Sequence, residues 1–388
     1  MKQHLVLVGG GHAHMTIMQR LDDYVSRGHR VTLISPSAYH YYSGMGPGML
    51  GGTYRPQQVR FNVRRMVEER GGEFIEGEVV RIDADNRTLI IDSGRQVNYH
   101  VVSFNTGSGV PLDRIGATRS EVLPVKPIHN LMELRRELLS RLPGQTVRLL
   151  VVGGGAAGVE ISGNLWRLAE QAGGRVEITL IAGERLLGRF PARVRSRALA
   201  SLTRRGIVVR EGAHVRSVAD GRAVLDDNSV VPYDLALSAS GVQPSGIFRA
   251  SRLPVGPDGG LLVNACLQSV TYPELFGGGD CISFQEQPLD KVGVYAVREN
   301  PILYRNLMAA LEDQPLLRFS PQKGYLLILN MGDGRGILSK GSLTLEGRWA
   351  FRFKDWIDRR FMRRFQLSGE LDDIGPVPIN DHSQEEVK

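Results

Sequence analysis

The chain has 388 residues and a formal net charge of +7, and hydrophobic residues make up 42% of it. This composition excludes an intrinsically disordered chain and suffices for two or three packed units. Two cysteines cannot build a disulfide framework, and no apolar run is long enough to span a membrane. The sequence contains no zinc-ligand spacing, helix-turn-helix or RNA-binding pattern, so the positive charge does not indicate a nucleic-acid partner. We therefore expect a cytoplasmic protein without a metal site.

The first segment, HLVLVGGGHAHMTIMQRL, predicts a buried strand, a glycine turn and the start of an amphipathic helix. Gly9 and Gly11 open the turn, while His14 stands where a third glycine would allow close packing of helix on strand. Such glycines let the backbone approach the pyrophosphate of a dinucleotide at a helix N-terminus. The following strand, HRVTLIS, ends at Ser35, which can still exchange one hydrogen bond with a ribose.

Residues 36–51, PSAYHYYSGMGPGMLG, combine three tyrosines with alternating glycine and methionine and contain no cysteine. Because a serine hydroxyl has no accessible redox couple, the run from Tyr41 to Gly44 cannot relay an electron pair. The glycines that follow would let the backbone approach a bound cofactor closely.

A second turn repeats the first pattern in VRLLVVGGGAAGVEISGNLWRLAE. Gly153, Gly155 and Gly158 complete a G-x-G-x-x-G fingerprint, 144 residues (153 minus 9) after the first copy. Two copies, each followed by another strand, predict two doubly wound α/β domains.

The strand after the second turn, VEITLIA, ends without the usual acidic residue. Glu184 stands two residues beyond it and would favour NADH, whereas the adjacent Arg185 could accommodate the 2′-phosphate of NADPH. The sequence leaves this choice open.

Residues 348–365, RWAFRFKDWIDRRFMRRF, concentrate seven basic and two acidic residues with six aromatic ones. RWAFRF alternates like a strand, and from Lys354 onward the pattern predicts a helix with Ile357, Phe361, Met362 and Phe365 on one apolar stripe. A basic amphipathic helix of this kind is typical of binding to an anionic membrane surface, so the protein could be peripheral on the cytoplasmic membrane face. Alternatively, the stripe packs on the core or across a homodimer. The terminal HSQEEVK is expected to be disordered.

Three further segments resemble landmarks of the glutathione-reductase-like flavoproteins. VTYPELFGGGDC, which contains Gly279 and Asp280, resembles their closing FAD motif, where the aspartate binds the ribityl chain. Asn105-Thr106-Gly107 and Ser240-Gly241 resemble their two crossover turns. The landmarks occur in the family's order.

This resemblance implies a discontinuous FAD domain with an inserted NAD(P) domain. The expected boundaries are 1–110 and 241–320 for the FAD domain and 111–240 for the NAD(P) domain. A C-terminal α+β segment is expected to follow over 321–388.

Within that superfamily the chain resembles the type II NADH dehydrogenases. It looks closest to the flavoprotein half of selenide, water dikinase fusions, which share GGGHAH, YSGMGPGMLGG, VGVYAVRENP and GRWAFRFKDWIDRRFMRRF. The resemblance implies electron transfer from NAD(P)H through non-covalent FAD to a quinone-like acceptor without a cysteine relay.

The resemblance also assigns site residues. It implies a catalytic role for Glu160 where nicotinamide meets flavin. Lys291 is expected at the pyrimidine edge of the flavin, where positive charge stabilises the reduced form. Arg298 is expected toward the acceptor, in a stretch where the family's quinone pocket carries glutamines that this chain lacks. The residues implied for FAD are Gly9, Gly11, His12, Ala13, Ser35, Ser43, Gly44, Val80, Thr106, Gly107, Gly279, Asp280 and Gly293. Those implied for NAD(P) are Gly153, Gly155, Ala156, Gly158, Glu184, Ser240 and Gly241.

Two other functions remain open. A sulfide:quinone oxidoreductase would need thiols beside the flavin, but Cys266 and Cys281 do not match that arrangement and are expected to be small buried residues. A non-enzymatic flavin-binding sensor or assembly partner would not need the complete second fingerprint.

Overall fold

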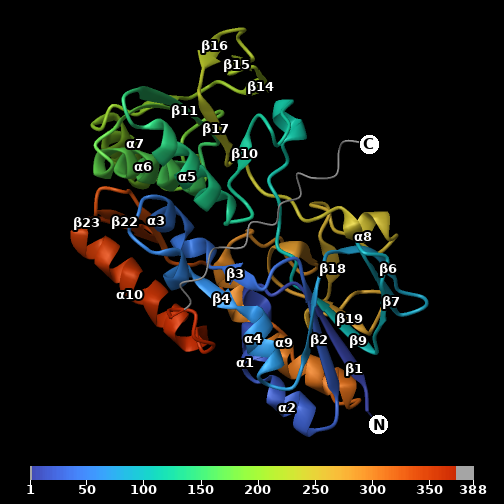
Figure 1. The fold of residues 1–388 in the computed structure, drawn as a ribbon. Coiled ribbons are helices and arrows are strands. Elements are labelled where there is room, and N and C mark those ends of the chain that lie inside the picture. The colour runs from blue at the N-terminus through green and yellow to red at the C-terminus, as the bar shows by residue number, and fades with distance from the viewer. Residues whose placement is uncertain (1, 373–388) are drawn as a thin grey trace.

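A computed structural model describes residues 2–372, in which two parallel sheets form the centres of two α/β domains (Figure 1). The first sheet has the order β19-β9-β1-β2-β5. Its strands are β1 (His4–Val8), β2 (Arg30–Ser35), β5 (Glu73–Glu76), β9 (Val101–Phe104) and β19 (Leu275–Gly277). Because β19 comes from late in the chain, this domain is discontinuous, as expected.

The helices of the first domain are α1 (Met15–Gln19), α2 (Leu21–Ser26), α4 (Val63–Glu68) and α9 (Gly293–Leu311). Helix α9 packs against the 3-10 turn His12–His14, α1 and β9, so a late segment covers the first glycine turn. A small antiparallel sheet of β6 (Val79–Asp83), β7 (Thr88–Ile91) and β8 (Gln96–Asn98) precedes β9.

The second sheet has the order β10-β17-β11-β12-β13. Its strands are β10 (Leu123–Pro124), β11 (Thr146–Val152), β12 (Arg175–Ile181), β13 (Val208–Arg210) and β17 (Leu235–Ser238). Its helices are α5 (Asn130–Arg141), α6 (Ala156–Gln171) and α7 (Ala192–Thr203), and a meander of β14 (Val215–Ala219), β15 (Arg222–Leu225) and β16 (Val230–Pro232) precedes β17. All these elements lie between β9 and β19 in sequence, so the second domain is inserted into the first.

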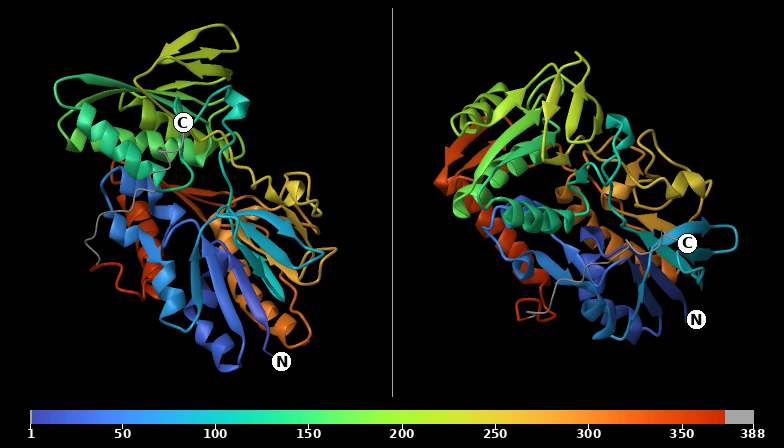
Figure 2. Two further views of the ribbon diagram at one scale, coloured as in Figure 1. Left: turned by 45° about the vertical axis from the view of Figure 1, so that its right-hand side comes forward. Right: turned by 45° about the horizontal axis from the view of Figure 1, so that its top comes forward.

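The C-terminal segment consists of the antiparallel strands β21 (Leu327–Asn330), β22 (Gly336–Lys340) and β23 (Leu343–Gly347) followed by helix α10 (Arg348–Phe365). It lies along one side of the molecule beside α3 (Gly46–Leu50), below the second domain (Figures 1 and 2). The strand–helix segment expected at the C-terminus is therefore present, whereas the HSQEEVK tail lies outside the described residues. The residue boundaries of the domains stay a prediction.

The expectation that RWAFRF forms a strand is wrong, because α10 begins at Arg348. Strand β23 ends at Gly347, whose φ of 144° turns the chain. Trp349, Phe353 and Trp356 recur at i, i+4 and i+7, so the short alternation fits one helical face equally well.

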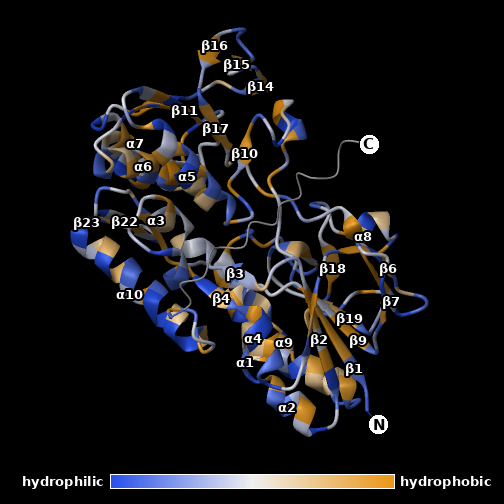
Figure 3. Ribbon diagram, in the orientation of Figure 1, coloured by the Kyte–Doolittle hydropathy of each residue, from blue (hydrophilic) through white to orange (hydrophobic). Residues whose placement is uncertain are grey.

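The apolar stripe proposed for membrane insertion is also placed differently. Met362 and Phe365 are buried in the main core, Phe361 packs against that core, and Ile357 packs on Ile328 and Leu338 beneath β21 and β22. The stripe therefore holds α10 on its own protein, and the solvent side of the helix combines hydrophilic residues with the exposed aromatic side chains of Trp349, Phe353 and Trp356 (Figure 3). No helix within residues 2–372 has the length and apolar character that a membrane crossing requires.

Candidate active site

The turns assigned to FAD meet at the side chain of Asn105, directly after β9. Its Oδ1 accepts a hydrogen bond from Ala13 N at 3.0 Å, and its Nδ2 donates to Gly278 O at 2.6 Å. Because β1, β9 and β19 are neighbours in a parallel sheet, their carboxyl ends open on the same edge, where α/β proteins bind ligands.

Both glycines of the first turn are required by this arrangement. A Cβ atom on Gly9 would lie 2.4 Å from the carbonyl oxygen of Asn105, and one on Gly11 would lie 2.1 Å from its Oδ1. The glycines therefore serve packing against Asn105 as well as access for a ligand. Asn105 belongs to a turn that the sequence had indicated. Only the tertiary structure shows that its side chain joins two turns by hydrogen bonds.

Open space around the same residues fits FAD. Gly107 has a φ of +72° and no heavy atom within 4 Å of the place where its Cβ would stand, and Gly293 at the start of α9 faces only the Oγ of Ser43, at 3.8 Å. Thr106 precedes Gly107 in the chain, and Asp280 Oδ2 accepts a hydrogen bond at 2.7 Å from the hydroxyl of Ser108, which follows Gly107. The residues present could thus hold the pyrophosphate, ribityl chain and ring of FAD.

Lys126 is a site residue that sequence reasoning missed. Its Nζ lies 2.6 Å from Asp280 Oδ2 and 3.1 Å from Ser108 Oγ, although it belongs to the second domain. Its position just beyond the carboxyl end of strand β10 is the only sequence feature that could have indicated it.

Two other predicted residues are exposed, Arg298 on α9 and Val80 on β6. Lys291 lines the same small cavity as Gly279 and Asp280; it pairs with Asp258 at 2.7 Å and donates to the carbonyl of Ile282. Ser35 is buried at the end of β2.

The neighbour of Arg298, Glu299, points the opposite way. It is buried and accepts a hydrogen bond from Gly279 N at 2.5 Å, and its burial raises the carboxyl pKa to about 7. This buried carboxyl therefore fixes the backbone of the turn immediately before Asp280.

The second glycine turn has the geometry of a complete fingerprint. A Cβ on Gly158 would lie 1.8 Å from Gly153 O, and one on Gly154 would meet Ala182 O at 2.3 Å, so helix, turn and strand are in close contact. Gly155, by contrast, faces open space at the N-terminus of the 16-residue helix α6. An anion such as a pyrophosphate fits there.

Residues expected for the remainder of NAD(P) lie around that opening. Gly241 has a φ of +104° and faces open space, and the hydroxyls of Ser240 and Ser238 are 2.9 Å apart. Glu184 is strongly exposed, and its Oε1 lies 3.9 Å from His214 Nε2. The ring of His214 is in turn held 3.2 Å from Asp226.

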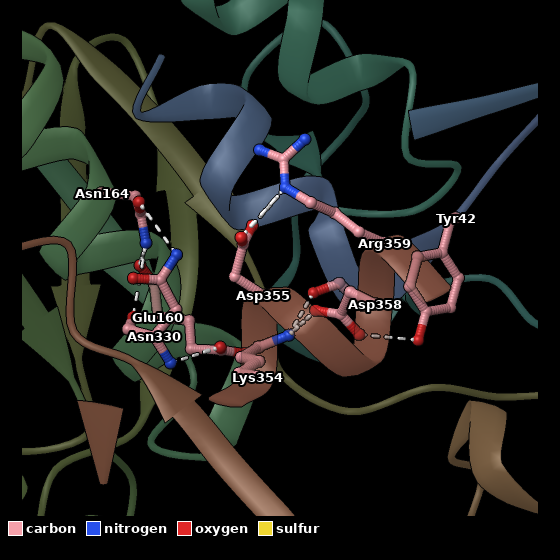
Figure 4. Close-up of polar contacts among 9 residues, drawn as sticks. Tyr42, Glu160, Asn164, Asn330, Lys354, Asp355, Asp358 and Arg359 are labelled. Carbon is pink, nitrogen blue, oxygen red and sulfur yellow. Dashed lines mark hydrogen bonds and ion pairs between the residues drawn. The ribbon is translucent and has the colours of Figure 1, made fainter. Parts of the chain in front are cut away.

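Glu160 on α6 faces the C-terminal segment (Figure 4). Its Oε1 accepts a hydrogen bond from Asn330 N at 2.7 Å, and Asn164 donates to its backbone carbonyl at 2.8 Å. Desolvation raises the pKa of the Glu160 carboxyl to about 7, although the nearby charge of Lys354 acts in the opposite direction. A carboxyl with this pKa can give or take a proton at neutral pH.

A line of polar groups leads from Glu160 across α10 to the tyrosine run (Figure 4). Lys354 Nζ donates to Asp358 Oδ2 and to Gly44 O, both at 2.7 Å, and Tyr42 OH donates to Asp358 Oδ1 at 3.0 Å. Burial lowers the pKa of Lys354, but the charges of Asp358 and Glu160 outweigh it and raise that pKa above its ordinary value. Burial raises the pKa of Asp358 as well.

The glycines after Tyr42 allow the first domain to pack closely on the second. A Cβ on Gly46 would lie 3.1 Å from Ile128, and one on Gly51 would lie 2.5 Å from Asn164 Oδ1. Helix α3 accordingly packs against α5 and α6. Close approach to flavin, which the sequence suggested for this loop, stays a prediction.

The two thiols differ in accessibility. Cys281 is fully buried, and its burial raises the thiol pKa to about 11, which disfavours a nucleophilic thiolate. Cys266 is partly exposed. The expectation of a buried cysteine is thus confirmed for Cys281 alone.

Comparison with known proteins gives a family match over most of the chain. The model of the family described as pyridine nucleotide-disulphide oxidoreductase matches residues 3–302. A type II NADH:quinone oxidoreductase of Staphylococcus saprophyticus is 22% identical over 95% of this chain and 96% of its own. Demethylphylloquinone reductase NdbB of Synechocystis is 27% identical over 75% of this chain and 76% of its own length.

A third relative is the mitochondrial internal alternative NAD(P)H-ubiquinone oxidoreductase A1 of Arabidopsis thaliana, which is 24% identical. The match covers 74% of this chain but only 62% of that protein. Among solved structures, the sulfide:quinone oxidoreductase of Aquifex aeolicus superposes with a TM-score of 0.78 at 17% identity, covering 94% of this chain and 91% of that one. NDH2 of Plasmodium falciparum with NADH gives 0.76 at 15% identity, covering 94% and 99%. At these identities the two structures establish the shared fold.

Replacing Asn105 by Ala is expected to weaken FAD binding at least tenfold, because it leaves the buried Ala13 N without a partner and leaves Gly278 O with only the weak thiol donor of Cys281 at 3.3 Å. Each unsatisfied group costs about 1–3 kcal/mol. Asn306→Ala is the matched control, since Asn306 is equally buried and bonds Cys266 O and Leu317 away from the turns. Fluorescence titration of apoprotein with FAD measures the difference. Equal FAD affinities for the two variants would contradict the role of Asn105.

Proposed function

The chain belongs to the pyridine nucleotide-disulphide oxidoreductase family, and from this premise we propose that it transfers electrons from NAD(P)H through non-covalent FAD to a quinone-like acceptor. The observations that carry the proposal are the open backbone at Gly107 and at Gly155, one in each domain, and the Glu160 carboxyl, whose pKa near 7 responds to the charges of Lys354 and Asp358. When bound, FAD supplies the two-electron chemistry that no side chain of this protein can perform.

The residues of the chain would divide the work as follows. The turn at Gly155 binds the pyrophosphate of NAD(P), with Ser240 and Gly241 beside it and Glu184 at the ribose. The turns at Gly9, Gly107 and Gly279 bind FAD. Because NADH suits an acidic residue at the ribose, we propose NADH as the better donor.

Glu160 would supply a proton to the acceptor. Reduction of a quinone consumes two protons as well as two electrons, and a carboxyl with a pKa near 7 is protonated often enough at neutral pH to donate one. The charge of Lys354 influences the pKa of Glu160, and its ion pair with Asp358, to which Tyr42 OH donates, would keep the local charge balanced when the proton leaves. Arg298, being exposed, is proposed only as a contact at the outer edge of an acceptor site.

The rival sulfide:quinone reaction is disfavoured by the environment of the thiols. The shared fold with the Aquifex aeolicus enzyme does not supply the missing chemistry, because Cys281 is buried with a raised pKa and residues 41–44 contain no cysteine. A flavin sensor is disfavoured by the complete second turn. The closer kinship with the selenide, water dikinase flavoprotein stays a prediction.

The protein should bleach its flavin absorbance on anaerobic mixing with NADH, faster than with NADPH, and regain it when a soluble quinone is added. Stopped-flow absorbance separates the two steps. A bound flavin that neither coenzyme reduces would refute the proposed donor, and reduced flavin that sulfide produces instead would restore the rival reaction.

Glu160→Gln should alter the second step and its pH dependence. In the wild type the protonated fraction of Glu160 falls by about tenfold for each pH unit above its pKa near 7, so quinone reduction should slow as the pH rises from 6 to 9. Glutamine cannot donate the proton, and the variant should therefore be slow and nearly independent of pH. The reoxidation rate after reduction by light measures this step alone. A variant that keeps the wild-type pH profile would exclude Glu160 as the donor.

We also propose that α10 binds an anionic membrane surface, though not through the stripe that the sequence suggested. Trp349, Phe353 and Trp356 are 48%, 39% and 50% exposed on one face of the helix. Arg360 stacks over Trp356 at 5.4 Å, and the exposed Arg352 and Arg363 extend the same face. Full burial of such side chains is worth about 1.5–3 kcal/mol each, and each arginine near anionic lipid adds about 1 kcal/mol.

The triple variant Trp349→Ser, Phe353→Ser, Trp356→Ser should lose most of its sedimentation with vesicles of anionic phospholipid at low salt. The control is Val208→Ser, Val230→Ser, Val270→Ser, which removes equally exposed apolar groups elsewhere. Wild-type protein that stays in the supernatant at low salt would overturn the membrane proposal, whereas concentration-dependent self-association would favour the homodimer.

A further inference from the structure

The ammonium group of Lys126 lies where the segments assigned to FAD converge. It contacts Asp280 in the closing motif and Ser108 next to Gly107. Its charge also reaches the two buried histidines of the first turn and the tyrosine run: burial lowers the pKa of His12 to about 4 and that of His40 well below its usual value, and Lys126 acts in the same direction on both. Two segments of the first domain thus contact this cation, and its charge influences histidines on two more.

This cation is delivered by the second domain. Strand β10 pairs with β17, and Val125 N donates to Ser238 O at 3.0 Å, which fixes the backbone immediately before Lys126. The side chain is 24% exposed, so solvent screens its charge less than that of a surface lysine. The position of the charge therefore depends on the docking of one domain on the other.

Two other lysines near the site are engaged elsewhere. Lys291 pairs with Asp258, and Lys354 pairs with Asp358. Within the described residues, Lys126 is the lysine that forms an ion pair with Asp280, the aspartate of the closing motif. The role at the pyrimidine edge of the flavin that was expected of Lys291 stays a prediction.

We propose that Lys126 stabilises the negative charge that bound flavin acquires on reduction and thereby sets its reduction potential. This inference rests on the proposed function, because it takes the bound group to be FAD. Hydride from NAD(P)H carries two electrons and one proton, so the site gains one negative charge for each hydride accepted. A cation next to the site stabilises that charge in the same way that fixed dipoles stabilise an oxyanion.

Removal of the ammonium group takes away one positive charge and leaves the carboxylate of Asp280 without its countercharge. The surroundings of the flavin then become more negative. This change disfavours further negative charge and therefore lowers the potential.

Lys126→Met removes the charge at similar length, and Lys126→Arg retains it. The potential of the holoprotein is measured by light-driven reduction against reference dyes, which needs neither NAD(P)H nor a quinone. Sulfite is the second probe, because its adduct with oxidised flavin places a negative charge on the ring. We expect Lys126→Met to bind sulfite about tenfold more weakly and to have a potential about 30 mV lower, the same tenfold change for a two-electron couple. Lys126→Arg should stay within about threefold of the wild type.

Lys340→Met is the matched control, since Lys340 is exposed on β22 and the change in net charge is identical. A holoprotein of Lys126→Met with wild-type potential and sulfite affinity would overturn the inference, as would an equal effect in Lys340→Met. If Lys126→Met holds no FAD even in excess, Lys126→Arg provides the test. A reduction potential and a sulfite affinity within about threefold of the wild type support a role of the charge, and a larger change contradicts it. A wild-type protein that binds no FAD at all would instead refute the proposed function.

Discussion

The side-chain amide of Asn105 is the contact on which the first site depends. It holds a turn from the start of the chain to a turn from residues 278–280 by one accepted and one donated hydrogen bond. The two turns are far apart in sequence and belong to strands on either side of β9. Without the amide, the buried Ala13 N would lose its partner and Gly278 O would keep only the weak thiol donor of Cys281, so the two turns would no longer be held together by a strong hydrogen bond.

The second domain completes that site in two places. Lys126 reaches Asp280, and α3 packs on α5 and α6 through glycines that leave no room for a Cβ. The C-terminal segment then closes the other side, because Lys354 and Asp358 of α10 bind Gly44 and Tyr42 while β21 binds Glu160. The titratable groups of the proposed reaction are thus supplied by three parts of the chain that meet only in the folded state.

Burial gives these groups their chemistry. Desolvation raises the pKa values of Glu160 and Glu299 to about 7, but the two carboxyls have different surroundings. Glu299 is fixed by Gly279 N and braces a turn, whereas Glu160 lies next to a buried lysine–aspartate pair that can compensate a change in its charge. The neighbours, more than the pKa, make Glu160 the better proton donor.

The sequence by itself determined the two glycine turns, their order and the two α/β domains, because glycine spacing and strand periodicity are local properties of the chain. It also indicated Asp280 and Glu160 from motifs adjacent to them. It could not indicate Lys126, since no local pattern encodes an ion pair between domains. It left open whether the stripe of Ile357, Phe361 and Phe365 packs on the core or binds a membrane, because Trp349, Phe353 and Trp356 form an equally good apolar face at helical spacing. Only the packing of α10 on β21, β22 and Phe61 decided which face is buried, and that choice depends on surfaces formed by distant segments.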